Sequence, residues 1–120
     1  MRGLILGLAV GLAVLLTAGE GRAGYYSGQK LNEVCNNDSL VSVGLCFGYI
    51  LGVYDAGKVL DEATDKRQWQ SGFTSCVPDG VKPGQLKEVV SKWLQQHPEN
   101  WHYRANSLVA AALEWGFPCR

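Results

Sequence analysis

Apolar residues occupy nearly every side of residues 40–60, and polar residues gather only at the edges of this stretch. A helix that is apolar all round is typical of the interior of a domain. Its apolar part is short for a membrane span and ends at Asp55 and Lys58, which favours a soluble domain. Asp38 or Ser39 can cap its start, because their side-chain oxygens accept the unpaired amide protons of the first turn. We therefore expect a buried central helix here.

Small residues recur every four positions along this stretch, namely Gly44, Gly48, Gly52 and Ala56. This spacing puts them on one slowly drifting helix face. Each glycine inside a helix costs about 1 kcal/mol relative to alanine, so we expect the close approach of another backbone to compensate. That backbone can be a helix of the same chain, which we favour, or the same helix in a second subunit.

The clearest amphipathic pattern lies in residues 83–96. Pro83 suits the first position of a helix, where a missing amide proton is harmless. The apolar side chains follow the i, i+3, i+4, i+7, i+8 spacing of a helix on a domain surface. They are Leu86, Val89, Val90, Trp93 and Leu94.

A further helix is expected after His97, with Pro98 in its first turn. It should run to Gly116, because glycine ends helices and Pro118 follows. Its apolar face carries Trp101, Ala105, Leu108, Val109, Ala112 and Leu113. A shorter helix is expected over residues 29–34. Since no alternating apolar–polar run and no Asn-Gly hairpin turn is present, the pattern predicts an all-α fold of about four helices.

Residues 61–75 are polar, with mixed charges around a single large aromatic side chain, Trp69. We expect a long charged surface loop. An aromatic anchor within a charged rim is the composition that binding hot spots favour, although Trp69 can instead fold back and cover the core. The candidate residues for partner binding are Asp65, Lys66, Arg67, Gln68 and Trp69.

Residues 1–23 have a positively charged start, a 13-residue apolar stretch over 4–16 and small residues leading to Ala23. This order is typical of a secretory signal peptide, and the apolar stretch falls short of the roughly 20 residues of a membrane-spanning helix. We expect cleavage after Ala23, with Ala18 and Gly19 as alternatives.

Cleavage after residue 23 leaves residues 24–120, which is 97 of the 120 residues and enough for one domain. Loss of Arg2, Arg22 and Glu20 takes the eleven basic and eleven acidic side chains to nine and ten, a net charge of about −1. This balance predicts no nucleic-acid partner and, after cleavage, no membrane partner.

The four cysteines, Cys35, Cys46, Cys76 and Cys119, all follow the signal peptide. Export takes them to an oxidising compartment, so we expect two disulfides, each contributing on the order of 3–4 kcal/mol. Four cysteines allow three pairings. We favour Cys46 with Cys76 and Cys35 with Cys119, because the second pair would tie both ends of the domain together.

The same residues favour neither catalysis nor a cofactor. Cysteine intervals of 11, 30 and 43 contain no metal-binding knuckle, and His97 and His102 do not share a helix face. We expect Asp55 to be buried and to bond a backbone group, Tyr49 or His97, because a buried carboxylate needs partners. Trp115 is expected to serve packing rather than recognition. No catalytic residue, metal or cofactor is predicted.

An ordered series of short motifs spans residues 31–119. It includes Cys46-Phe47-Gly48-Tyr49-Ile50 with Gly52 and Asp55, Cys76-Val77-Pro78, His97-Pro98-Glu99 and Phe117-Pro118-Cys119. With these motifs the chain resembles the Tai/Rap-type immunity proteins, which protect bacteria from peptidoglycan amidase effectors delivered by type VI secretion.

The resemblance implies a periplasmic, all-helical protein, usually a homodimer, that binds a cognate amidase and blocks its substrate cleft without catalysing a reaction. Specificity for one effector would then lie outside the shared pattern, above all in residues 61–75. A general periplasmic binding module or acid-stress chaperone remains the alternative. An enzyme is the least supported class, since no catalytic constellation is found.

Overall fold

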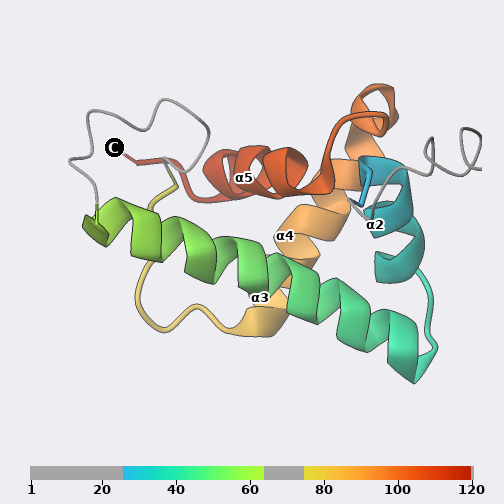
Figure 1. Ribbon diagram of the computed structural model, residues 1–120, viewed down its shortest axis with the longest axis horizontal. Coiled ribbons are helices and arrows are strands. Elements are labelled where there is room, and N and C mark those ends of the chain that lie inside the picture. The colour runs from blue at the N-terminus through green and yellow to red at the C-terminus, as the bar shows by residue number, and fades with distance from the viewer. Residues whose placement is uncertain (1–25, 64–74, 120) are drawn as a thin grey trace, which may run out of the picture.

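The computed structural model describes residues 26–63 and 75–119, with the backbone alone for residues 59–63. Within these residues the secondary structure is helical, with two isolated bridges and no strand. The predicted all-α fold is therefore confirmed (Figure 1). The elements are α2 (Gly28–Cys35), α3 (Leu40–Ala63), α4 (Pro83–Gln96), the 3-10 helix η1 (Pro98–Asn100) and α5 (Ala105–Gly116).

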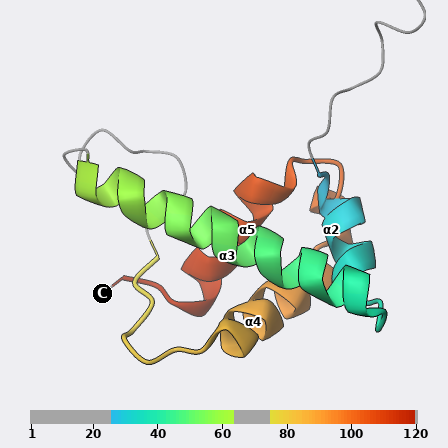
Figure 2. The same ribbon diagram turned by 60° about the horizontal axis from the view of Figure 1, so that its bottom comes forward.

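The long helix α3 runs across one side of the molecule and contacts each of the other three α-helices. In Figure 1, α2 lies beside the beginning of α3 and α5 lies alongside its later part. Helix α4 passes between them, and it packs against α2, α3 and α5 (Figure 2). The core therefore lies on one side of α3.

The first turn of α2 is held by the turn that precedes α5. The first amides of a helix have no partner inside the helix. Here the Gly28 N–H donates to the Tyr103 carbonyl at 2.9 Å, and the Gln29 N–H donates to the Trp101 carbonyl at 3.0 Å. These bonds join the beginning of the described chain to the turn before α5.

Helix α3 begins as predicted and ends later. The Ser39 hydroxyl accepts the Ser42 N–H at 3.2 Å, so of the two predicted caps Ser39 is the one used. The helix continues to Ala63. Residues 61–63, which we expected in the loop, are therefore helical.

The prediction that α3 is buried is wrong. Residues Leu40–Lys58 have a mean hydropathy of 1.5 and are long and apolar enough to cross a membrane by length and composition, yet only 17% of this stretch is buried. Leu40 is 90% exposed and Val41 is 73% exposed. Because an all-round apolar pattern does not specify which face is covered, the sequence could not reveal that one face of this helix lies open.

Helix α4 has the predicted bounds, Pro83–Gln96. Its start is fixed by Gln85, whose side-chain oxygen accepts the Lys82 N–H at 2.8 Å. At its other end the Gln95 side-chain amide donates to the Asn36 side chain at 2.7 Å, which ties α4 to the end of α2.

The helix expected from Pro98 to Gly116 is instead divided into η1 and α5. Trp101 lies in the turn between them, and its indole N–H donates to the Leu94 carbonyl at 2.8 Å. The interruption leaves the Trp101 carbonyl free to accept from the first turn of α2, which a continuous helix would prevent.

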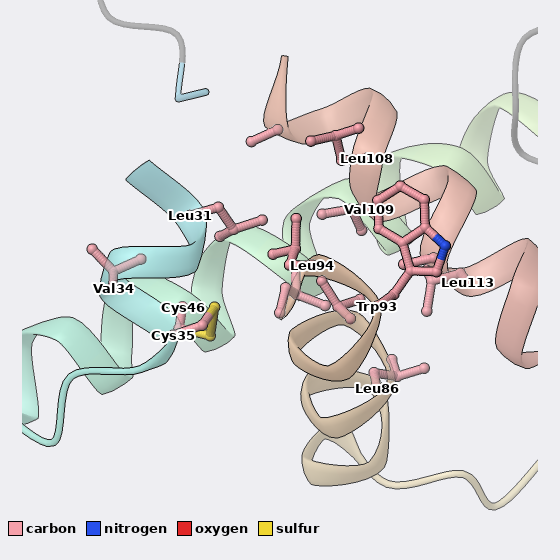
Figure 3. Packing of buried hydrophobic residues seen from close by; sticks show 14 residues of the cluster. Leu31, Val34, Cys35, Cys46, Leu86, Trp93, Leu94, Leu108, Val109 and Leu113 are labelled. Carbon is pink, nitrogen blue, oxygen red and sulfur yellow. A yellow bond between two sulfur atoms is a disulfide. The ribbon is translucent and has the colours of Figure 1, made fainter. Parts of the chain in front are cut away.

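The core is assembled from all four α-helices. In Figure 3 the leucine and valine side chains of α4 and α5 face the side chains of α2, with the Trp93 indole beside them. Its members are Leu31, Val34, Cys35, Cys46, Ile50, Leu86, Val90, Trp93, Leu94, Ala105, Leu108, Val109, Ala112 and Leu113.

All four cysteines form disulfides, as predicted, but the favoured pairing is wrong. Cys35 pairs with Cys46, and Cys76 pairs with Cys119. The first bond joins the end of α2 to α3 inside the core (Figure 3). Because α2 and α3 are consecutive and α2 packs against the beginning of α3, the last turn of α2 lies beside the early turns of α3, and this places the first two cysteines together.

Candidate functional site

The five candidate residues for partner binding lie outside the described residues. They are Asp65, Lys66, Arg67, Gln68 and Trp69. The structure does describe the chain on both sides of them. Helix α3 ends at Ala63 before them, and the described chain resumes at Ser75 after them.

The segment after this stretch is attached to the C-terminal residues by an antiparallel bridge and a disulfide. Ser75 forms an antiparallel bridge with Pro118. The Cys76 N–H donates to the Phe117 carbonyl at 2.8 Å, and the Cys76 side chain forms the disulfide with Cys119. Figure 1 shows this segment running beside the chain end. Residue 75 is therefore held in a fixed position on the helical frame.

The glycine face of α3, which we define as Gly44, Gly48 and Gly52, is open. All three residues are exposed, and a Cβ atom built on any of them would meet no atom of another element within 4 Å. The favoured explanation, close packing against another helix of the same chain, is therefore wrong for the described residues. The alternative, the same helix in a second subunit, stays a prediction.

Large apolar side chains extend the open face of α3. Leu40, Val41 and Leu45 are the exposed large aliphatic residues of the described chain. Asp55 lies on the same side, because it is seven residues after Gly48, close to two helical turns. Asp55 is exposed rather than buried, so our expectation of a buried carboxylate with partners is wrong.

His97 closes the end of α4 and bonds a carboxylate. Its Nδ1 lies 2.9 Å from the Glu99 Oε1, and its ring lies 4.5 Å from the Trp93 ring between centroids. The hydrogen bond with His97 holds the pKa of Glu99 below its usual value. Within the described residues no group of three or more His, Cys, Asp or Glu side chains is placed to hold a metal ion.

Two aromatic side chains stack across the junction between the N-terminal segment and α3. The Tyr26 and Tyr49 rings are 5.3 Å apart between centroids and nearly parallel. Burial raises the pKa of the Tyr49 phenol, a hydrogen bond from the Asn106 backbone acts in the opposite direction, and the neighbouring Tyr26 raises it further. Both tyrosines are partly buried and pack against the hydrophobic core.

Trp115, which we expected to serve packing rather than recognition, is a surface residue. It is 49% exposed. The sequence did not reveal this exposure, because Trp115 follows Leu108 by seven residues, close to two helical turns, and so falls at the edge of the apolar face of α5. It lies in the last turn of α5, three residues before Pro118.

The four helices and the paired cysteines define a small disulfide-stapled helical domain. The family model described as Rap1a immunity proteins matches residues 27–119, and the chain belongs to this family. A comparison with curated proteins gives no match.

Family membership implies a type VI effector immunity protein, whose partner is a secreted effector. It also implies a role as an inhibitor rather than as an enzyme. The two disulfides agree with an extracytoplasmic protein, since such bonds persist in oxidising compartments.

Proposed function

We propose that this chain is a periplasmic immunity protein that binds a type VI secreted peptidoglycan amidase and blocks its active-site cleft. The observation that carries the proposal is the family match over residues 27–119. Residues 1–23 would act as the signal peptide, and residues 24–120 would form the single immunity domain. An amidase that cleaves the cell wall has its substrate in the periplasm, so an inhibitor must be exported to meet it there.

The contact with the amidase is assigned to residues 61–75, with Trp69 as the anchor and its charged neighbours as the rim. Two features support this assignment. The sequence combines one large aromatic with several charges. The segment that follows is fastened by the bridge of Ser75 to Pro118 and the disulfide of Cys76 with Cys119. A chain segment fixed at one end loses less conformational entropy when it binds, which favours tight inhibition.

The test is protection. A type VI secreted peptidoglycan amidase of the same bacterium is produced in the periplasm with and without this protein, and lysis and cleavage of purified peptidoglycan are measured. Protection should require export and should appear as a tight one-to-one complex that abolishes cleavage. Continued cleavage in the presence of excess protein would contradict the proposal.

We further propose that the protein is a homodimer in which the glycine face of α3 meets its counterpart. A two-fold contact uses the same patch twice, so the patch must complement itself. The glycine face is exposed, and a Cβ atom added to any of its glycines would meet no other atom within 4 Å. Leu40, Val41 and Leu45 flank this face. Burial of this face by a second copy would compensate the roughly 1 kcal/mol that each helical glycine costs.

The same exposed side of α3 is the observation that favours a second candidate function, a general periplasmic binding module or acid-stress chaperone. Exposed apolar side chains such as Val41 can contact many unfolded clients. The two functions differ in stoichiometry. A chaperone would bind many unfolded proteins weakly, with more binding at low pH, whereas an immunity protein binds one amidase tightly.

A further inference from the structure

The two disulfides of this fold differ in their surroundings. Cys35 is 7% exposed and Cys46 is fully buried, and both belong to the hydrophobic core. Cys76 and Cys119 are both exposed, and neither belongs to the core. One bond therefore lies inside the folded domain, and the other lies on its surface.

We propose that the Cys76–Cys119 disulfide is a thiol-sensitive clasp, which a reductant opens while the Cys35–Cys46 disulfide and the helical core stay intact. The clasp is defined as the Cys76–Cys119 bond together with the bridge between Ser75 and Pro118. This inference rests on the proposed function, because the clasp holds the end of the stretch to which amidase binding is assigned. Opening the clasp would lower the affinity for the amidase.

The chemistry requires access to one sulfur atom. A thiolate attacks the Sγ of Cys76 or Cys119 and forms a mixed disulfide, and the other Sγ leaves as a thiolate. A second reductant thiol then attacks the mixed disulfide. Overall, two reductant thiols are oxidised to one disulfide, and the two cysteines are reduced to thiols. The same attack on Cys35 or Cys46 requires prior opening of the core, because these sulfurs are buried.

The rest of the fold does not depend on the clasp. Its cysteines connect no two α-helices directly, since Cys76 precedes α4 and Cys119 follows α5. Val77 and Phe117 are only partly buried where they pack on the core. The Cys35–Cys46 bond, in contrast, joins α2 to α3. Reduction of the clasp should therefore release the segment around Ser75 and leave the four-helix core folded.

The chemical test needs no amidase. The native protein is incubated with reduced glutathione, the free thiols are alkylated at intervals, and the modified cysteines are identified by mass spectrometry. Cys76 and Cys119 should be modified at least about tenfold faster than the buried pair. Over the same period the helical circular dichroism signal should stay constant, while hydrogen exchange at the Cys76 amide increases. Equal rates for the two disulfides, or loss of the helical signal with the exposed bond, would overturn the proposal.

The functional test compares two variants against the amidase used above. The clasp-free variant, with Cys76→Ser and Cys119→Ser, should retain the helical signal and bind the amidase about tenfold more weakly, a loss expected when a preorganised segment is released. Trp69→Ala separates the two proposals. Weaker binding by Trp69→Ala with normal binding by the clasp-free variant would overturn the clasp alone. Normal binding by both variants would overturn the assignment of residues 61–75 as well.

Discussion

Gly28 and Gly84 both lie in the first turn of a helix, but their surroundings are opposite. A Cβ atom on Gly28 would contact the Leu108 side chain and lie 3.0 Å from the Trp101 Cα, whereas one on Gly84 would meet nothing within 4 Å. Gly28 is therefore required by the close passage of the turn before α5, and Gly84 is not.

Gly28→Ala should lower the free energy of unfolding by about 1–3 kcal/mol, because the extra methyl group overpacks a tight site. Leu108 is buried and cannot swing away freely. The matched control is Gly84→Ala, which should raise the free energy of unfolding by about 0.4–1 kcal/mol by restricting the unfolded chain. Denaturant unfolding of both variants measures the difference. Equal stabilities would show that α2 and the turn are not tightly packed.

Tyr49 gives the fold a dependence on alkaline pH. Burial raises the pKa of its phenol above the ordinary tyrosine value of about 10 in the folded state. A group whose folded pKa is raised contributes stability below its unfolded pKa and loses it as the pH rises through the folded value. Stability should therefore fall above about pH 10 as the unfolded state ionises first.

Tyr49→Phe tests this dependence, because it keeps the ring stacked on Tyr26 and removes the ionisable hydroxyl. At neutral pH the variant should be less stable by about 1 kcal/mol, since the hydrogen bond with the Asn106 backbone is lost. Above about pH 10 the difference in the free energy of unfolding between the wild type and the variant should become smaller, because only the wild type loses stability as Tyr49 ionises in the unfolded state. The measurement is denaturant unfolding over this pH range, and a constant difference would contradict the assigned role of burial.

At the scale of the elements, what the sequence predicted depends on how local the signal is. Helix α4 has the predicted bounds because Pro83 marks its start and the His97-Pro98 pair marks its end. The division of the next helix was missed, because it depends on carbonyl groups that bond α2, far away in the chain. The sequence therefore predicts a helix whose ends are marked by nearby residues, but it does not predict an interruption that depends on contacts with a distant helix.

The errors in α3 and in the disulfides have the same origin. The apolar pattern of α3 is nearly symmetric around the helix, so it does not contain the information about which side the other helices cover. Cysteine order in the sequence likewise allows three pairings. The choice among them follows from the packing of α2 against the beginning of α3. The candidate contact residues 65–69 lie outside the described residues, so their assignment stays a prediction.

The open glycine face of α3 leads to a prediction about oligomeric state. Gly48→Leu should abolish the homodimer, because a leucine at the centre of the face would push the second helix away. The monomer should stay folded with an unchanged or raised melting temperature, since nothing in the described chain lies within 4 Å of this position. Light scattering after size exclusion measures the mass.

Gly84→Leu is the control for this experiment, because it places the same side chain on another helix at an equally open position. It should leave the mass of the dimer unchanged. A wild-type protein that is monomeric at all concentrations would contradict the dimer. A Gly48→Leu protein that still dimerises would move the contact to a different surface.

At the scale of the whole molecule, the two proposed contacts are assigned to different parts of the chain. The glycine face belongs to α3 alone, whereas the clasp joins the residues before α4 to those after α5. A protein built in this way can use the first surface for a second copy and residues 61–75 for the amidase.

The sharpest test of this arrangement is Trp69→Ala. If Trp69 is the anchor, its removal should cost about 2 kcal/mol or more of binding, roughly a thirtyfold rise in Kd, and should leave the melting temperature nearly unchanged. Trp115→Ala is the matched control, since Trp115 is an exposed tryptophan that lies on α5, outside residues 61–75. It should bind the amidase as the wild type does.

The charges beside Trp69 should act on the rate of association. Lys66→Glu with Arg67→Glu should mainly slow association and change its dependence on salt, because rim charges steer the encounter and contribute little once contact is made. Affinity, association rate and thermal stability are measured for each variant. If the loop variants bind as the wild type does, the amidase contacts another surface. If Trp69→Ala loses stability and binding together, this side chain belongs to the core, and the anchor must be sought among the exposed aromatic residues of the helices, such as Trp115.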